Sequence, residues 1–390
     1  GSLDIIIMIN YNNKIIFFLY YFFLISFLGI TNNYFTFENS LIFGGADGQS
    51  YMAISESFPK ITAEKIQPIH SERFFFYYIF GFFSKISNIE IYNIYRLFVI
   101  LIIGLINILL ILILKKKKLE ISLILIFLTL INLNPYISRF YIAVPTIIND
   151  LIFIFGITLL IYSLESNKYV FLILSLIILF FSRQTSIAVI VSLILTKLIY
   201  KQNFIIKTKT ILIAITLFFI IYLINFNYSS HTFEVESFRW EQYSIETRLF
   251  GFLREDTLLK QKFIFLLLPF LSYLPLIAFF IIFFKFRNLR LIFFNNSNIF
   301  FYSIIATLIL AQPVLSGVYI TGKNIIRLTT LSYILILIVL FNFMIKDKII
   351  KLSSLILFYC FIIGWSLHPT FSKIEFFEFF AKKININFYK

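Results

Sequence analysis

The arginines of this chain are the residues best suited to chemistry on a charged substrate. A guanidinium group binds phosphate through two parallel hydrogen bonds, and each charge-assisted bond contributes about 1.5 to 3 kcal/mol. The stretch LFFSRQTSIAV places Arg183 and Gln184 between two apolar runs, and YISRFYIAVPTIINDLIF places Arg139, Asn149 and Asp150 around a helix entrance. A charge at membrane depth costs about 2.5 to 3.5 kcal/mol, so it usually faces a cavity or a partner. These five residues are predicted to line a cavity; snorkelling to the interface is the alternative for Arg183.

The composition indicates the class of protein that positions these residues. The chain has 390 residues, is 60% hydrophobic, has a mean hydropathy of +0.93 and carries only 14% charged residues, whereas soluble domains carry about 25%. It is therefore predicted to be an all-α polytopic membrane protein with the lipid bilayer as a partner. The net charge of +15 lies in short clusters between apolar runs, which excludes nucleic-acid binding along one face. The single cysteine excludes an intramolecular disulfide and a cysteine metal site.

The apolar runs predict about eleven membrane spans within one domain, residues 1–390, since a crossing helix needs roughly 17 to 25 residues. The candidate spans are 15–30, 91–114, 119–133, 146–163, 168–182, 186–200, 210–226, 263–285, 297–320, 328–345 and 351–366. The run FFFYYIFGFF, Phe74 to Phe83, covers only about 15 Å as a helix and is too short to cross.

Lysine clusters assign the sides, because Lys and Arg in short loops accumulate on the cytoplasmic side. If Phe74 to Phe83 does not cross, Lys14, Lys115 to Lys118 and the later lysine clusters all fall on one face. The N-terminus is then inside, and the working face is outside. The outer face receives the first loop 31–90, residues 132–150, Arg183 with Gln184, a large loop 227–262, residues 321–327 and the C-terminal tail 367–390.

Eight of the ten arginines lie on or near this outer face, which is the opposite of what positive-inside sorting predicts. Pairing with outer acids or with lipid headgroups is the alternative for any one of them. For the set, a phosphate-bearing ligand at the outer leaflet is favoured. In LSGVYITGKNIIR, Lys323 and Arg327 are four residues apart and could share a helix face toward the same ligand.

The first outer loop contains two predicted surface helices. In GGADGQSYMAISESFP, helical spacing puts Asp47, Tyr51, Ile54 and Phe58 along one stripe of a short amphipathic helix, which Pro59 ends. Phe74 to Phe83 forms the second element, and together the helices are expected to frame a groove. The alternative role for Asp47 is the N-cap of a helix over 48–58, worth about 1 kcal/mol.

Just before the second helix, the segment HSER supplies His70, Glu72 and Arg73. The first two could contact the ligand. An interfacial salt bridge with Arg73 is the alternative.

With these features the sequence resembles the C-type (GT-C) glycosyltransferase fold: multispan bacterial enzymes that take a sugar from a polyprenyl-phosphate carrier on the outer leaflet. The resemblance rests on an acidic residue soon after the first span, two surface helices in that loop, arginines at later outer edges and a large outer loop. The sequence ADGQSYMAIS followed by HSERFFFYYIFGFF is similar to a pattern in uncharacterised bacterial membrane proteins of this type. The pattern is Asp-Gly-x-x-Tyr, then Arg before an apolar run. The resemblance implies a plasma-membrane enzyme with a periplasmic or extracellular active face and a glycan, lipid or protein acceptor.

The resemblance also implies roles for single residues. Asp47 matches the loop carboxylate that acts as general base or positions the acceptor, because an acceptor hydroxyl must lose its proton as it attacks the anomeric carbon. Arg73, Arg139, Arg183 and Arg327 are expected to stabilise the charge on the leaving phosphate. Mg²⁺ or Mn²⁺ between Asp47 and Glu56 or Asp150 is left open, since these carboxylates show no ligand spacing.

Two other functions compete. A polysaccharide-repeat polymerase or ligase would also have ten to twelve spans and outer arginines, and it would depend mainly on the loop 227–262, in which Trp240 and several tyrosines could stack on a sugar ring. A lipid-linked sugar flippase or transporter usually shows internal repeats and midplane charges. No repeat is evident here, so this function ranks third.

Overall fold

The computed structural model describes residues 11–31, 45–60, 70, 72–201, 204–232, 250–253, 259–283, 285–286, 296–321, 324–342, 344–345 and 352–367. Most of the predicted loop 227–262 and nearly all of the tail 367–390 lie outside these residues. The described part is helical apart from a two-residue pairing of β1 (Lys285–Phe286) with β2 (Met344–Ile345). The prediction of an all-helical fold is therefore confirmed.

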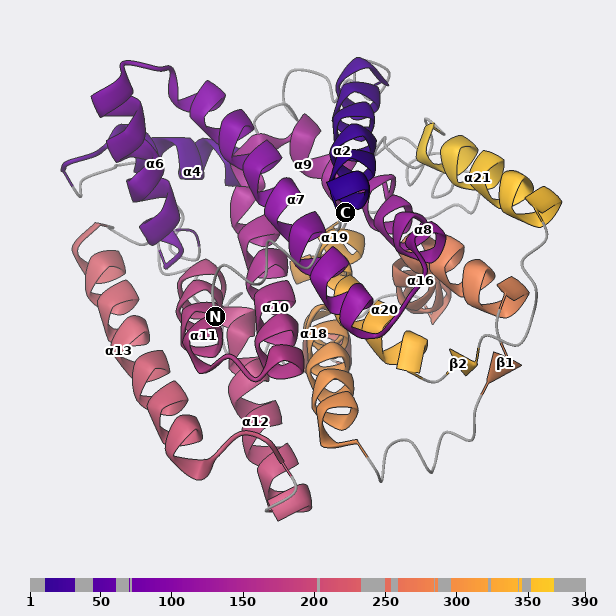
Figure 1. Cartoon of the computed structure of the whole chain (residues 1–390). Coiled ribbons are helices and arrows are strands. Elements are labelled where there is room, and N and C mark those ends of the chain that lie inside the picture. Colours follow the sequence, from indigo (N-terminus) through magenta and orange to yellow (C-terminus); the bar gives the residue numbers. More distant parts are fainter. Residues whose placement is uncertain are drawn as a thin grey trace.

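A helix occupies each of the predicted spans (Figure 1). These helices are α2 (Tyr11–Thr31), α7 (Ile91–Lys116), α8 (Ile121–Asn132), α10 (Ile148–Ser166), α11 (Tyr169–Ser182), α12 (Ile187–Tyr200), α13 (Thr208–Thr232), α16 (Leu259–Phe283), α18 (Ser297–Thr321), α20 (Tyr333–Asn342) and α21 (Leu352–Leu367). Six stretches of the described residues are long and apolar enough to cross a membrane, which fits a polytopic membrane protein. The total of eleven crossings stays a prediction, because helices such as α8 and α12 are shorter than a full span.

Short helical turns connect several of the long helices and were not predicted. They are α9 (Ser138–Ala143), η2 (Pro145–Ile147), η3 (Gln184–Ser186), α19 (Ile325–Thr329) and η6 (Thr330–Ser332). Pro145 at the first position of η2 has no amide hydrogen to place in a helix, so it suits a helix start. Each of these turns contains or adjoins a charged residue of the predicted site. They set the directions in which the side chains point, namely those of Arg139, Asp150, Arg183 and Arg327.

The helix α10 is the centre of the fold. In its most apolar window 94% of the residues are buried, against 28% for the peripheral α13. The helices α7 and α11 pack on α10, and one continuous apolar core runs from α2 to α21. Side chains at the start of α10 are therefore held in the middle of the molecule.

The lysine-rich loop after α7 lies at the far end of α10. Lys117 Nζ lies 3.3 Å from Glu165 Oε1 and 3.3 Å from Asn342 Oδ1, and Lys116 Nζ contacts the Glu165 carbonyl. Fifteen residues separate Asp150 from Glu165, which is about 22 Å of helix. The lysine loop is thus separated from the start of α10 by most of the helix length. The assignment of the two ends to opposite faces of a membrane stays a prediction.

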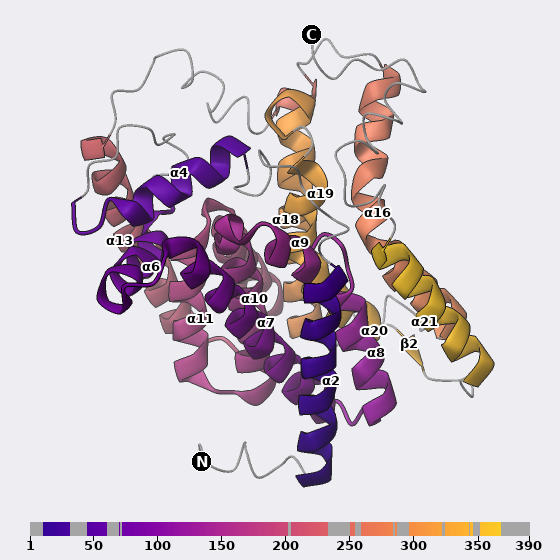
Figure 2. The ribbon, with the colours of Figure 1, turned by 90° about the horizontal axis from the view of Figure 1, so that it is seen from above.

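The two helices predicted in the first outer loop are present as α4 (Gly45–Glu56) and α6 (Phe74–Ser87), and they pack on each other (Figure 2). Ser55 Oγ donates to the Tyr77 carbonyl at 2.7 Å. A Cβ on Gly81 would collide with the Ser55 carbonyl, so the close approach of the helices requires glycine there. Their position on a membrane surface stays a prediction.

The structure corrects the alternative role of Asp47 as an N-cap. The helix α4 begins at Gly45, so Asp47 lies inside its first turn and does not precede it. A carboxylate in the first turn still interacts favourably with the helix dipole. Its side chain, however, contacts residues from other parts of the chain.

Candidate functional site

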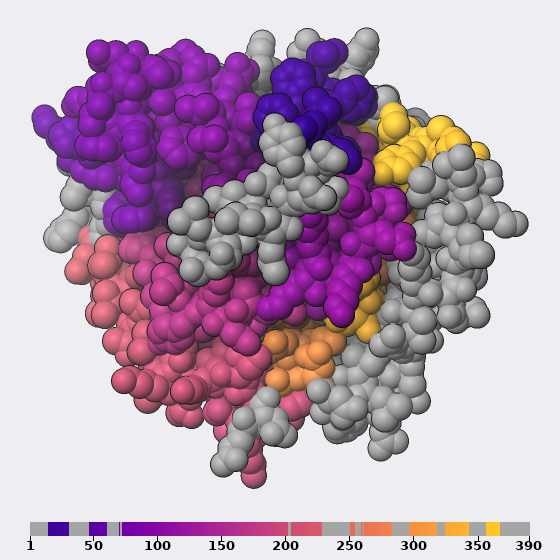
Figure 3. Space-filling view, in the orientation of Figure 1, coloured from indigo at the N-terminus to yellow at the C-terminus, as the bar shows by residue number. Residues whose placement is uncertain are grey.

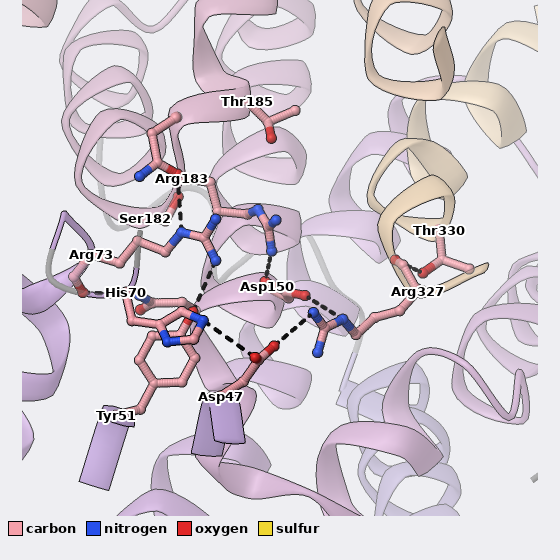
Figure 4. Close-up of polar contacts among 12 residues, drawn as sticks. Asp47, Tyr51, His70, Arg73, Asp150, Ser182, Arg183, Thr185, Arg327 and Thr330 are labelled. Carbon is pink, nitrogen blue, oxygen red and sulfur yellow. Dashed lines mark hydrogen bonds and ion pairs between the residues drawn. The ribbon is translucent and has the colours of Figure 1, made fainter. Parts of the chain in front are cut away.

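A cluster of charged and polar side chains lies where the starts of α4, α6, α10 and α19 approach the junction of α11 and α12 (Figure 4). Its members are Asp47, Tyr51, His70, Glu72, Arg73, Asn149, Asp150, Arg183, Gln184 and Arg327. We call these residues the arginine cluster. They come from five separate segments of the sequence, so the cluster exists only in the folded chain.

Asp150 holds the cluster together. Its carboxylate lies between two guanidinium groups: Arg183 Nη1 contacts Oδ1, and Arg327 Nε lies 3.3 Å from Oδ2. The Asp150 side chain is only 1% exposed. A carboxylate buried to this degree stays ionised only when positive partners compensate its lost hydration. Asp150 therefore fixes the positions of both arginines.

Asp47 is the more accessible of the two carboxylates, with 30% of its side chain exposed. Arg327 Nη2 lies 3.5 Å from Asp47 Oδ2, and His70 Nε2 lies 3.3 Å from Oδ1. Burial favours the protonated acid, but the hydrogen bond from His70 and the charge of Arg327 outweigh burial and hold the pKa of Asp47 below its usual range. Asp47 is therefore ionised at neutral pH.

His70 is a buried neutral partner of Asp47. Burial lowers the pKa of His70 below its ordinary value of 6.5; Asp47 opposes this shift, whereas Arg73 and Arg327 add to it. A neutral imidazole that contacts a carboxylate through Nε2 carries its hydrogen there. Nδ1 is then an acceptor, and it is buried without a hydrogen-bond partner among the described residues.

Arg73 differs from the other two arginines of the cluster because its direct hydrogen bonds go to neutral groups. Its Nε donates to Gln184 Oε1 at 3.0 Å and its Nη1 donates to the Tyr51 hydroxyl at 2.9 Å. Its carbonyl accepts from Asn149 Nδ2 at 3.1 Å. Gln184 in turn donates to Glu72, which places this third carboxylate one residue away from the guanidinium. Among the described residues, no carboxylate contacts Arg73 directly.

The buried part of the cluster therefore carries more positive than negative charge. Three guanidinium groups face the carboxylates of Asp47 and Asp150, and the half-buried Glu72 contacts only the neutral amide of Gln184. Several buried polar atoms at this site have no hydrogen-bond partner within the described residues: His70 Nδ1, Tyr141 hydroxyl, Asn149 Oδ1, Arg183 Nε and Arg327 Nε. Native folds leave few such atoms, and each calls for an explanation. The unpaired donors, the Tyr141 hydroxyl and Arg183 Nε, suit the oxygens of an anion, whereas the unpaired acceptors, His70 Nδ1 and Asn149 Oδ1, suit a hydroxyl.

Ten of the twelve predicted site residues belong to the arginine cluster, and two do not. Arg139 Nε donates to Ser366 Oγ at 3.1 Å, and its guanidinium lies 5.7 Å from the centre of the Phe27 ring. It is thus held by α21 and α2, away from the cluster. Lys323 lies outside the described residues.

Tyr141 is a residue of this site that the sequence did not single out. Its pKa is raised, first by complete burial and then by the nearby negative charge of Asp150. Tyr141 lies two residues after Arg139 in α9, and residues two apart on a helix point in nearly opposite directions. The sequence singled out the segment that contains both residues. The direction of α9 decides that Tyr141, and not Arg139, lies near Asp150.

A metal ion has no obvious place in the described part of the chain. No group of three or more His, Cys, Asp and Glu side chains there is arranged to hold one. Neither carboxylate that was considered as a second ligand is placed to share a cation with Asp47. Asp150 contacts two arginines, and Glu56 is exposed at the other end of α4.

Comparisons of the chain with protein-family models, with curated proteins and with solved structures found no match. The interpretation of the arginine cluster therefore rests on its own geometry.

Proposed function

We propose that the chain is an integral membrane glycosyltransferase that moves a sugar from a polyprenyl-phosphate donor to an acceptor hydroxyl. The observation that supports this proposal is the surplus of buried guanidinium charge beside a partly exposed carboxylate, Asp47. Such a site offers binding for a phosphate and a hydrogen-bond acceptor for a hydroxyl, which are the two groups that this transfer must handle at once.

In the proposed reaction, the acceptor oxygen bonds to the anomeric carbon while the carbon–phosphate oxygen bond breaks. The bonding electrons leave with the phosphate, whose growing negative charge is stabilised by arginine. Arg73 is the first candidate for this contact, because its Nη2 makes no hydrogen bond to the described residues. Arg327 is the second candidate, since it lies between Asp47 and Asp150.

Asp47 accepts a hydrogen bond from the acceptor hydroxyl and orients it. Its low pKa makes it a weaker base than a carboxylate tuned near neutral pH, so of the two roles that the resemblance implies, acceptor positioning is favoured. The proton released from the hydroxyl passes to the Asp47 carboxylate as the new bond forms, and the hydrogen bond from His70 Nε2 holds that carboxylate in place.

Asp150 is a positioning residue in this proposal. It contacts Arg183 and Arg327 and fixes the direction of both guanidinium groups. Preorganised charges of this kind stabilise a transition state without rearranging during the reaction.

The test is sugar transfer from a polyprenyl-phosphate-linked sugar in membranes, with Asp47→Asn and Arg73→Gln compared with wild type at equal expression. Matched controls are Glu90→Gln and Arg96→Gln, which change exposed residues between α6 and α7 or early in α7. Both cluster variants are expected to lose at least ten-fold in rate, and both controls are expected to retain activity. Full activity of Asp47→Asn would refute its role. Loss only with changes in the loop 227–262 would favour the polymerase or ligase.

A further inference from the structure

A cavity of about 260 Å³ lies between α2, α7 and α8. On α7 it is lined by Gly104, Asn107, Ile108 and Ile111, which follow one another at the spacing of a single helix face. The other side is lined mainly by aromatic residues of α2, Phe17 to Tyr21. In the space-filling view α2 lies at the surface beside the residues of α7 (Figure 3). The cavity is separate from the arginine cluster.

The polar groups that line this cavity already have partners within the protein. The Tyr20 hydroxyl hydrogen-bonds with Thr129 Oγ1 at 2.5 Å, and the Tyr21 hydroxyl donates to the Ile100 carbonyl at 2.6 Å. Asn107 Oδ1 accepts from Asn132 Nδ2 at 2.8 Å. A polar ligand would find few free hydrogen-bonding groups there, so the lining favours hydrocarbon.

The surroundings of the cavity identify the source of that hydrocarbon. Ile108 at its rim is 52% exposed, and Phe18 on the α2 side is 69% exposed. Large apolar side chains exposed on a helix of a membrane protein face lipid tails. The cavity therefore opens toward the acyl chains of the bilayer.

The positive charge of Lys115 indicates that the headgroup of the bound lipid is negative. Its ammonium group lies 5.5 Å from the centre of the Phe17 ring, which lines the cavity, and it is one turn beyond Ile111 on α7. Lys116 and Lys117 contact Glu165, whereas Lys115 has no acidic contact among the described residues. Basic pockets between membrane helices bind anionic headgroups.

We propose that the cavity between α2 and α7 binds one acyl chain of an anionic phospholipid whose phosphate contacts Lys115. The cavity covers the α7 stripe from Gly104 to Ile111, about 10 Å of helix, and Lys115 continues that stripe by about 6 Å toward the headgroup layer. The chain gains from burial of its methylene groups, and Lys115 selects the headgroup charge. The inference does not depend on the proposed sugar transfer.

The test measures lipid retention by native mass spectrometry of the purified protein after exchange with phosphatidylglycerol or phosphatidylcholine of equal chain length. Wild type is expected to retain one phosphatidylglycerol molecule in preference to phosphatidylcholine. Ile108→Trp fills the cavity from its exposed rim and is expected to lose both lipids. Its control is Leu101→Trp, because Leu101 is 51% exposed on α7 but does not line the cavity.

Lys115→Gln is expected to keep the acyl chain and to lower the preference for phosphatidylglycerol about five-fold, the effect of one lysine charge at an anionic lipid surface. Its control is Lys118→Gln, because Lys118 is an exposed neighbour that does not line the cavity. Circular dichroism and elution volume verify the fold of each variant. Equal retention by Ile108→Trp and Leu101→Trp, or equal preference in Lys115→Gln and Lys118→Gln, overturns the proposal.

Discussion

Two of the buried groups of polar side chains in the described part of the chain are satisfied in different ways. The first is the amide network of Asn107, Asn132 and Ser138, in which Asn132 Nδ2 donates to Asn107 Oδ1 at 2.8 Å and Ser138 Oγ donates to Asn132 Oδ1 at 3.0 Å. It is neutral, and each of its side-chain atoms has a partner. The second is the arginine cluster, which is charged and leaves several buried atoms without hydrogen-bond partners among the described residues.

This difference separates a structural role from a functional one. A satisfied neutral network holds α7, α8 and α9 together and offers nothing to a ligand. The arginine cluster costs more to bury, and its three guanidinium groups outnumber the two carboxylates that contact them, which leaves donors for a ligand. Four substitutions can sharpen or break this comparison, and they are ordered here by expected effect.

The largest effect is expected at the centre of the arginine cluster. Asp150→Asn leaves Arg183 and Arg327 facing each other without the carboxylate between them, and breaking a buried pair in this way costs about 3 to 5 kcal/mol. The thermal unfolding midpoint in detergent is expected to fall strongly. Asp150→Asn with Arg183→Gln is expected to recover part of the loss. A midpoint equal to that of wild type would show that Asp150 does not hold the cluster together.

Arg73→Gln is expected to affect ligand binding more than folding. The substitution removes the one guanidinium of the arginine cluster whose direct hydrogen bonds go to neutral groups, Gln184 and Tyr51. A lost charge-assisted hydrogen bond costs about 1.5 to 3 kcal/mol. Binding of a polyprenyl-phosphate lipid is therefore expected to weaken by about ten-fold or more, measured by thermophoresis of the labelled protein in detergent. Unchanged affinity, with Arg96→Gln as the control, would mean that the surplus charge serves the fold alone.

The sequence predicted the arginine cluster through topology rather than through a motif. The positions of the lysine loops predict which ends of the helices share a face, and that assignment puts Asp47, Asp150 and Arg327 on one face. Their pairing could not be predicted, because Arg327 and Asp47 are 280 residues apart and no local rule joins them. The separation of Arg139 from the cluster has a similar cause: the direction of the short helix α9 depends on packing against α2 and α7, which hydrophobic patterning does not reveal.

A substitution in the amide network is expected to lower stability and to leave activity unchanged, which is the reverse of the effect expected for Arg73→Gln. Asn107→Leu removes one partner and leaves Asn132 Nδ2 with one acceptor fewer, which costs about 1 to 3 kcal/mol. Sugar transfer at a temperature well below unfolding is expected to stay unchanged, because the network does not contact the arginine cluster. The pair Asn107→Leu with Asn132→Leu is expected to be less destabilising than the sum of its parts, since it removes both polar partners. A loss of transfer in the folded Asn107→Leu protein would contradict the separation of the two groups.

The smallest effect is expected from the titration of His70. The unfolded chain protonates His70 near its ordinary pKa of 6.5, whereas burial lowers the pKa of His70 in the folded protein. Between these two values the unfolded state binds more protons, so the free energy of unfolding decreases as pH falls below about 6.5. Asp47 adds no slope in this range, because its ordinary pKa of 3.8 is lowered further by folding.

His70→Gln is therefore expected to flatten the fall of the unfolding midpoint between pH 7.5 and pH 5.5. Any contribution of His231 and His368 is present in both proteins and cancels in the comparison. Above pH 7.5 His70 is neutral in both states, so the difference between the two proteins is expected to be independent of pH. Parallel curves over the whole range would show that folding does not shift the pKa of His70. A wild-type midpoint that instead rises relative to His70→Gln as pH falls would show that His70 is protonated in the folded protein, and its Nδ1 would then be a donor and not an acceptor.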